Sequence, residues 1–178
     1  LKCAGREFCL LTNGFEVGYS LTQALSVSAM LVSVAYACTI GSWRRGLIGY
    51  ALCNAVAYLL VAIAGALRPD RTLLSFEVLM LFALPGILLV IFVAGRRYRT
   101  SRGAMDRSLV IAALLLLLVQ VAYFAYGAAG ITQQLWMGGQ GFYFSENDVL
   151  HVGMIGWLAY VLTRLGTDLR DHAAAGAR

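Results

Sequence analysis

Charged residues are scarce in this chain of 178 residues, where Asp, Glu, Lys and Arg together make up 13% of the sequence. Soluble globular domains carry about twice that share. Hydrophobic residues account for 60%, which is above the usual half. The composition therefore excludes an ordinary soluble domain and favours an integral membrane protein that crosses the bilayer several times.

Lysine and histidine are almost absent: the chain has one lysine, Lys2, and two histidines, His151 and His172. A retinal protein needs a lysine inside its bundle, and haem held between helices usually needs histidines from two of them. Both cofactors are thus disfavoured. The sequence also contains no P-loop, GxSxG or HExxH motif. Zinc stays open, because His151 lies close to Asp148.

Long apolar runs dominate what is present, and about 20 apolar residues cross a bilayer as a helix. The sequence predicts an all-α bundle of five transmembrane helices over 15–166. A short arm, 1–14, precedes the bundle, and a tail, 167–178, follows it. The five predicted helices cover residues 15–40, 47–67, 73–94, 109–129 and 149–165.

The distribution of positive charge predicts the orientation. In the five-helix topology, ten of the 14 basic residues fall on one side, including five arginines between Gly95 and Arg107. Positive charge marks the cytoplasmic side, so we expect the N-terminus outside and the C-terminus inside, in a bacterial inner membrane. This explains the net charge of +5 without nucleic acid. The five arginines form either a topological anchor or a site for anionic headgroups.

Two further features face the outside in this topology. Cys3 and Cys9 lie in the N-terminal arm, where a disulfide and two unpaired thiols are both open. The loop 130–148 has no Lys or Arg and carries the aromatic residues Trp136, Tyr143 and two phenylalanines. This loop either covers the external mouth of the bundle or forms an ordinary aromatic belt at the headgroup level.

Four polar residues from three predicted helices share the external half of the bilayer: Glu16, Glu77, Asp148 and His151. Ionisable groups at this depth are expensive and often functional. Asp148 and His151 are three residues apart, so they lie on one helical face. They form half of a metal site, with Glu16 and Glu77 as further ligands. Alternatively, Ser145, Asn147 or Asp148 caps the helix, and His151 is paired with Asp148 in a buried structural hydrogen bond.

The stretch Asn147–His151, with the apolar run that follows it to Leu162, resembles the last helix of the CREST membrane proteins. This family includes alkaline ceramidases, progestin and adiponectin receptors and haemolysin-III-like proteins. Its last helix carries two zinc-binding histidines four residues apart. The resemblance implies that His151 matches the second histidine, whereas Asn147 replaces the first. Family members have seven helices and further ligands, so the resemblance implies a divergent relative without an intact zinc hydrolase centre.

The sequence thus predicts an outward-facing polar pocket that binds a lipid, an apolar small molecule or a metal. If the protein is an enzyme, we expect hydrolysis of a lipid, with a metal or His151 activating water. The alternative is a non-catalytic accessory subunit or a homo-oligomer, assembled through small-residue faces and the aromatic external loop. Small residues of the second helix are expected to form a close-packing face: Ala51, Ala55, Ala62 and Ala66. The pocket residues are expected to be Glu16, Glu77, Trp136, Tyr143, Asn147, Asp148 and His151.

Overall fold

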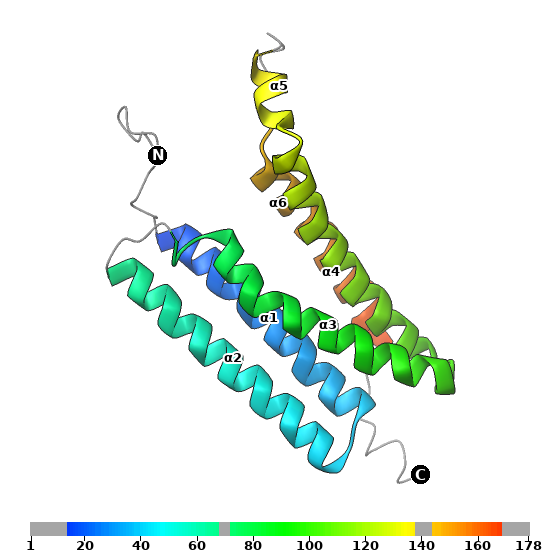
Figure 1. Ribbon diagram of the computed structural model, residues 1–178. Helices are drawn as coiled ribbons and strands as arrows, with labels where there is room; N and C mark the ends of the chain where they lie inside the picture. Colours follow the sequence, from blue (N-terminus) through cyan, green and yellow to red (C-terminus); the bar gives the residue numbers. More distant parts are fainter. Residues whose placement is uncertain (1–13, 68–71, 138–143, 169–178) are drawn as a thin grey trace. The chain divides into compact units, whose positions relative to one another are not determined.

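The computed structural model describes residues 14–67, 72–137 and 144–168, and every regular element in these residues is helical (Figure 1). The predicted all-α class is therefore confirmed. In chain order, the elements are α1 (Gly14–Cys38), α2 (Gly41–Leu67), α3 (Phe76–Ser101), α4 (Ala104–Ala128), α5 (Ile131–Met137), α6 (Glu146–Tyr160), the π-helical turn η1 (Val161–Leu165) and α7 (Gly166–Asp168).

Four of these helices are long and apolar enough to cross a membrane: α1 from Val17 onward, α2, α3 and α4. Their apolar windows have mean hydropathies between 1.5 and 2.7, and each has the length that a bilayer core requires. An integral membrane protein with four candidate spans is thus the coarse conclusion that the fold supports. Helix α6 has only 15 residues of regular α-helix.

Two linkers expected between helices are largely helical instead. Helix α2 already begins at Gly41, whose φ of +61° supplies the left-handed turn after α1. Helix α3 continues to Ser101, seven residues beyond the predicted end. Arginine is a good helix former, and its long side chain reaches the headgroups while the backbone stays regular. Basic residues therefore extend these helices rather than ending them.

The loop 130–148 contains an element that was not expected. Helix α5 occupies Ile131–Met137, directly after Gly130 with a φ of +61°. The glycine allows the sharp change of direction at the end of α4. Glycine-rich composition suggested flexibility, whereas Ile131–Met137 itself contains no glycine.

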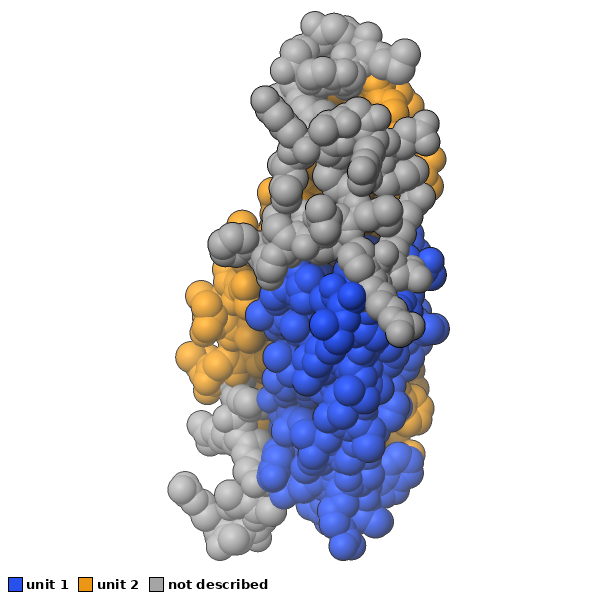
Figure 2. Space-filling view, turned by 90° about the vertical axis from the view of Figure 1, so that its left-hand side faces the viewer, with its two compact units in different colours: residues 1–89, 172–178 blue, residues 90–171 orange. Residues whose placement is uncertain are grey.

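The chain forms two compact units, which are coloured separately in Figure 2. Unit 1 comprises residues 1–89 and 172–178, and unit 2 comprises residues 90–171. Their boundary lies within α3. Each unit is described by itself, so the prediction of one common bundle stays a prediction.

In unit 1, α1 and α2 pack side by side along one buried face of α2. Ala51 and Ala62 of the predicted small-residue face are 1% and 2% exposed, which confirms that they pack inside. Ala66, in contrast, is exposed. The side-chain amide of Asn54 donates to the carbonyl of Phe82 at 3.1 Å, so this polar group of α2 is satisfied by α3 rather than left facing lipid.

In unit 2, α4 and α6 form an antiparallel pair. The indole Nε1 of Trp157 donates to the carbonyl of Ala112 at 2.9 Å. Near the middle of the pair the helices approach so closely that a Cβ on Gly153 would lie 2.7 Å from the methyl groups of Val119. The close contact shows why glycine is needed at this position.

Candidate functional site at the start of helix α6

Ser145 and Asp148 start helix α6 together. Ser145 is the N-cap, and both its backbone N–H and its hydroxyl donate to Asp148 Oδ2, at 2.7 and 2.8 Å. The Asp148 carboxylate thus reaches back to the N–H of the N-cap residue in a capping box, which satisfies a backbone donor at the helix start. The structural alternative for Asp148, a helix cap, is thus confirmed.

The same hydrogen bonds set the protonation of Asp148, which precedes the apolar run that begins at Val149. The donors of Ser145, first its backbone N–H and then its hydroxyl, lower the pKa of the Asp148 carboxyl below its ordinary value, and nearby His151 adds to this effect. Each of these groups stabilises the charged carboxylate more than the neutral acid. Asp148 is therefore an acceptor at neutral pH and a poor proton donor.

His151 lies one turn further along α6 and is exposed. Its Nδ1 lies 2.6 Å from the carbonyl oxygen of Asn147. A carbonyl can only accept a hydrogen bond, so Nδ1 carries the proton and the lone pair of the neutral ring is on Nε2. The hydrogen bond of Nδ1 is thus made with the backbone of Asn147, whose side chain is also exposed.

Glu146 and Thr132 form a contact that the sequence did not reveal. The Thr132 hydroxyl lies 3.1 Å from Glu146 Oε2, which joins α5 to the first turn of α6. The Tyr126 hydroxyl, at the end of α4, donates to the carbonyl of Phe144 at 2.9 Å. Glu146, Asp148 and His151, together with these partners, make one polar end of unit 2. Thr132 was overlooked because it lies in a segment expected to be an irregular loop.

The positions of the other predicted pocket residues do not show whether the predicted pocket forms. Glu77 is exposed in the first turn of α3 and belongs to unit 1. The side chains of Glu16 and Trp136, and all of Tyr143, lie outside the described residues. The predicted convergence of Glu16 and Glu77 on Asp148 and His151 therefore stays a prediction.

Metal binding finds limited support among the described side chains. In residues 17–67, 72–135 and 144–167, no three His, Cys, Asp or Glu side chains come together in a group that could hold a metal ion. Catalytic zinc sites use three protein ligands. Asp148 and His151 alone supply two, and one oxygen of Asp148 already accepts two hydrogen bonds.

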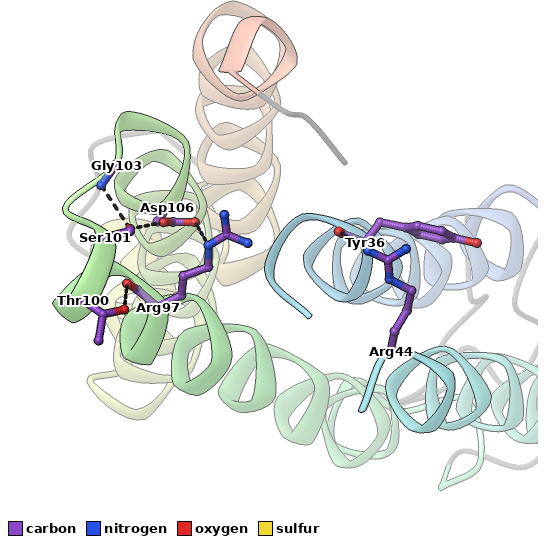
Figure 3. Close-up of polar contacts among 7 residues, drawn as sticks. All are labelled: Tyr36, Arg44, Arg97, Thr100, Ser101, Gly103 and Asp106. Atoms are coloured by element: carbon purple, nitrogen blue, oxygen red, sulfur yellow. Dashed lines mark hydrogen bonds and ion pairs between the residues drawn. The ribbon is translucent and has the colours of Figure 1, made fainter. Parts of the chain in front are cut away.

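A buried acidic group at the opposite end of unit 2 was also missed (Figure 3). Asp106 is 1% exposed, and its Oδ1 lies 3.2 Å from the Nε of Arg97. Its Oδ2 accepts a hydrogen bond from the hydroxyl of Ser101, which in turn accepts one from the N–H of Gly103 at 3.1 Å. A buried charge needs such partners. In the sequence, Asp106 is one acidic residue within an arginine-rich segment. Composition does not show which side chains are buried, so this group could not be recognised.

Arg44 has a structural task in unit 1 (Figure 3). Its guanidinium donates to the carbonyls of Tyr36 and Thr39 at 2.9 and 3.0 Å and lies 4.9 Å from the centre of the Tyr36 ring. These carbonyls belong to the last turn of α1 and the residue after it, where helical partners run out. Arg44 therefore closes the end of α1 in addition to marking topology.

No protein-family model, no curated protein and no solved structure matches this chain. The resemblance of Asn147–Leu162 to the CREST proteins is neither supported nor opposed by these comparisons. Function must therefore be argued from the geometry of the two units.

Proposed function

We propose that the protein is a five-helix membrane protein, with its N-terminus outside and its C-terminus in the cytoplasm, that binds a lipid or a similar apolar ligand along α6. The fifth span begins at Val149 and continues through the rest of α6, through η1 and through α7, which follow one another without a break. This stretch has about the 20 residues that a span needs. A bacterial inner membrane fits the distribution of arginines.

One observation carries the binding proposal: an exposed stripe runs from His151 down α6 and into η1. Ile155, Leu158 and Leu162 follow it at spacings of four, three and four residues, which places all of them on one helical face. Their exposed fractions are 68%, 46% and 75%. The stripe is about 16 Å long at 1.5 Å per residue, which is close to the hydrocarbon depth of one leaflet.

The stripe is apolar along most of its length and polar at its His151 end, as a lipid is apolar along its acyl chain and polar at its headgroup. Its apolar part suits an acyl chain, and its upper end presents the His151 ring and the side chain of Asn147 to a headgroup. The Asn147 carbonyl fixes the ring orientation, so little side-chain freedom is lost on binding. We propose binding rather than hydrolysis, because the carboxylate of Asp148 is engaged in the helix cap.

The experiment compares lipid retention by the full-length protein and matched variants. His151→Ala removes the headgroup contact, and Ile155→Ser breaks the apolar stripe. Leu60→Ser is the matched control, because Leu60 is 61% exposed on α2. Native mass spectrometry after purification in mild detergent should find lipid retained by the wild type and the control but lost from both α6 variants. Equal retention by all four proteins would contradict the proposal.

A second candidate function is an accessory subunit, and one observation favours it. Gly156 and Ala159 are exposed beside the stripe, and a Cβ placed on Gly156 would meet nothing within 4 Å. Small residues at such a surface allow a second helix to approach closely. Gly156→Leu should then dissociate a partner chain or a second copy, measured by size and composition of the purified complex, while lipid retention stays unchanged.

The accessory role is not required by exposed polar groups in the spans. Gln23 and Gln120 are 7% and 5% exposed, and Asn54 is half-buried with its amide on the Phe82 carbonyl. A polar side chain facing lipid would demand a partner. Because these three are turned away from the surface, lipid binding along α6 is the first proposal and assembly the second.

A further inference from the structure

The turn between α3 and α4 presents positive charge with little compensation. Its exposed arginines define what we call the basic hairpin: Arg96, Arg99, Arg102 and Arg107. Asp106 is the only acidic residue in the sequence between Glu77 and Glu146. It is 1% exposed and paired with Arg97. The carboxylate within the hairpin is therefore turned inward, and the hairpin keeps four exposed guanidinium groups.

Arg102 occupies a backbone conformation that disfavours it. Its φ is +53°, and it is the only non-glycine residue with a positive φ in residues 14–67, 72–137 and 144–168. The residue that ends a helix in this way is usually glycine, since side chains strain the left-handed region. Arginine at a position that favours glycine indicates that the Arg102 side chain has a role that offsets the backbone strain.

The neighbouring glycine does not serve the left-handed position. Gly103 has a φ of −69°, which any residue adopts. A Cβ there would lie 3.4 Å from Asp106 Oδ2, which is close to ordinary van der Waals contact. The glycine of the turn therefore lies outside the left-handed position, which Arg102 occupies.

The Arg102 side chain is also oriented. Its guanidinium carbon lies 5.8 Å from the centre of the Tyr98 ring, and its backbone N–H donates to the Tyr98 carbonyl at 3.0 Å. When a guanidinium lies over an aromatic ring, its N–H donors point toward the edge of the ring and past it. Arg99 lies three residues earlier and is exposed as well.

We propose that the basic hairpin binds the phosphate of anionic phospholipids, with Arg99 and Arg102 as the principal donors beside Tyr98. Guanidinium forks match phosphate oxygens. The hairpin joins two helices that are long and apolar enough to cross a membrane, so it lies at the depth of the headgroups. Each arginine of such a basic segment raises its affinity for the anionic lipids of the cytoplasmic leaflet by about fivefold.

The test measures binding of phosphatidylglycerol and phosphatidylcholine to the full-length protein in detergent micelles, at several salt concentrations. Arg99→Gln removes one donor, and Arg102→Gly removes the other while suiting the left-handed backbone. Arg45→Gln is the control, because it removes an equal charge from an exposed position at the start of α2. Inorganic phosphate and a short single-stranded DNA are added as competitors.

We expect the wild type to prefer phosphatidylglycerol, each hairpin variant to bind it about fivefold more weakly, and Arg45→Gln to bind it as the wild type does. Arg102→Gly should keep or raise the melting temperature, which separates its binding defect from misfolding. The proposal is overturned if both lipids bind alike, if either hairpin variant keeps wild-type affinity, or if the control loses as much. Displacement of lipid by millimolar phosphate or by DNA at comparable affinity would also overturn it.

Discussion

The two ends of unit 2 use carboxylates in opposite ways. At the start of α6, Asp148 is half-buried and accepts hydrogen bonds from the helix cap. At the basic hairpin, Asp106 is buried and neutralises Arg97. No lysine or arginine occurs between residues 108 and 163, so the first end stays acidic while the second stays basic. The placement of these two acids thus contributes to the difference in charge between the two ends.

Helix α4 separates these ends. Its 25 residues extend about 37 Å at 1.5 Å per residue, which is more than the hydrocarbon thickness of a bilayer. The ends can therefore lie at opposite membrane surfaces. Substitutions in unit 2 test whether the two ends differ in this way.

Asp106→Ala should have the largest effect on stability. It leaves the partly buried guanidinium of Arg97 without its carboxylate and Ser101 without its acceptor. Loss of a buried ion-pair partner costs about 3 kcal/mol, so the free energy of unfolding in detergent should fall by about this amount. Glu77→Gln, at an exposed position in α3, is the control and should change it little. Equal stability of the two variants would show that Asp106 does not hold the hairpin.

Gly153→Ala should weaken the packing that joins the two ends. The new methyl would meet Val119 at 2.7 Å, and overpacking costs about 1–3 kcal/mol. Gly156→Ala provides the matched control three residues away, where no atom lies within 4 Å. There only the gain in helix propensity, about 1 kcal/mol, remains. Thermal unfolding should therefore move down for the first variant and up or not at all for the second.

Asp148→Ala should have a smaller effect that depends on pH. Because the folded pKa of Asp148 is lowered, its stabilisation is fully present above the unfolded pKa of about 3.8 and is lost as the pH falls through the folded value. Unfolding of the wild type, followed from pH 6 down to pH 2, should show this loss below about pH 3.8, and the variant should lack that component. Identical pH profiles would contradict the role of Asp148 in the cap.

Arg102→Gly should have the smallest effect on folding, and in the opposite direction. Relief of the positive φ should raise the free energy of unfolding by about 1 kcal/mol, measured by denaturation in lipid-free detergent. A decrease would show that the Arg102 side chain stabilises the turn and would remove the argument from strain.

Much of the fold could be predicted, because the length of an apolar run is a local property that the sequence shows directly. Runs such as Leu109–Ala129 identify a helix without knowledge of its neighbours. Helix ends were less predictable, since arginines continue α3 to Ser101. A cap by Ser145, Asn147 or Asp148 was among the predicted alternatives, because these residue types commonly start helices.

The contacts between distant segments were not predictable. Thr132 and Glu146 are 14 residues apart, and their contact depends on the path of the chain through α5. Burial of Asp106 depends on how the α3–α4 turn closes, which composition does not record. The exposed stripe below His151 required knowledge of which face of α6 packs on α4.

The most direct test of the account is photo-crosslinking of the full-length protein in lipid nanodiscs with a phospholipid that carries a photoreactive headgroup. The account predicts that peptides containing His151 are labelled and that His151→Ala removes this label while labelling elsewhere is unchanged. Uniform labelling of the exposed apolar helices, with no change at the start of α6 in the variant, would contradict it.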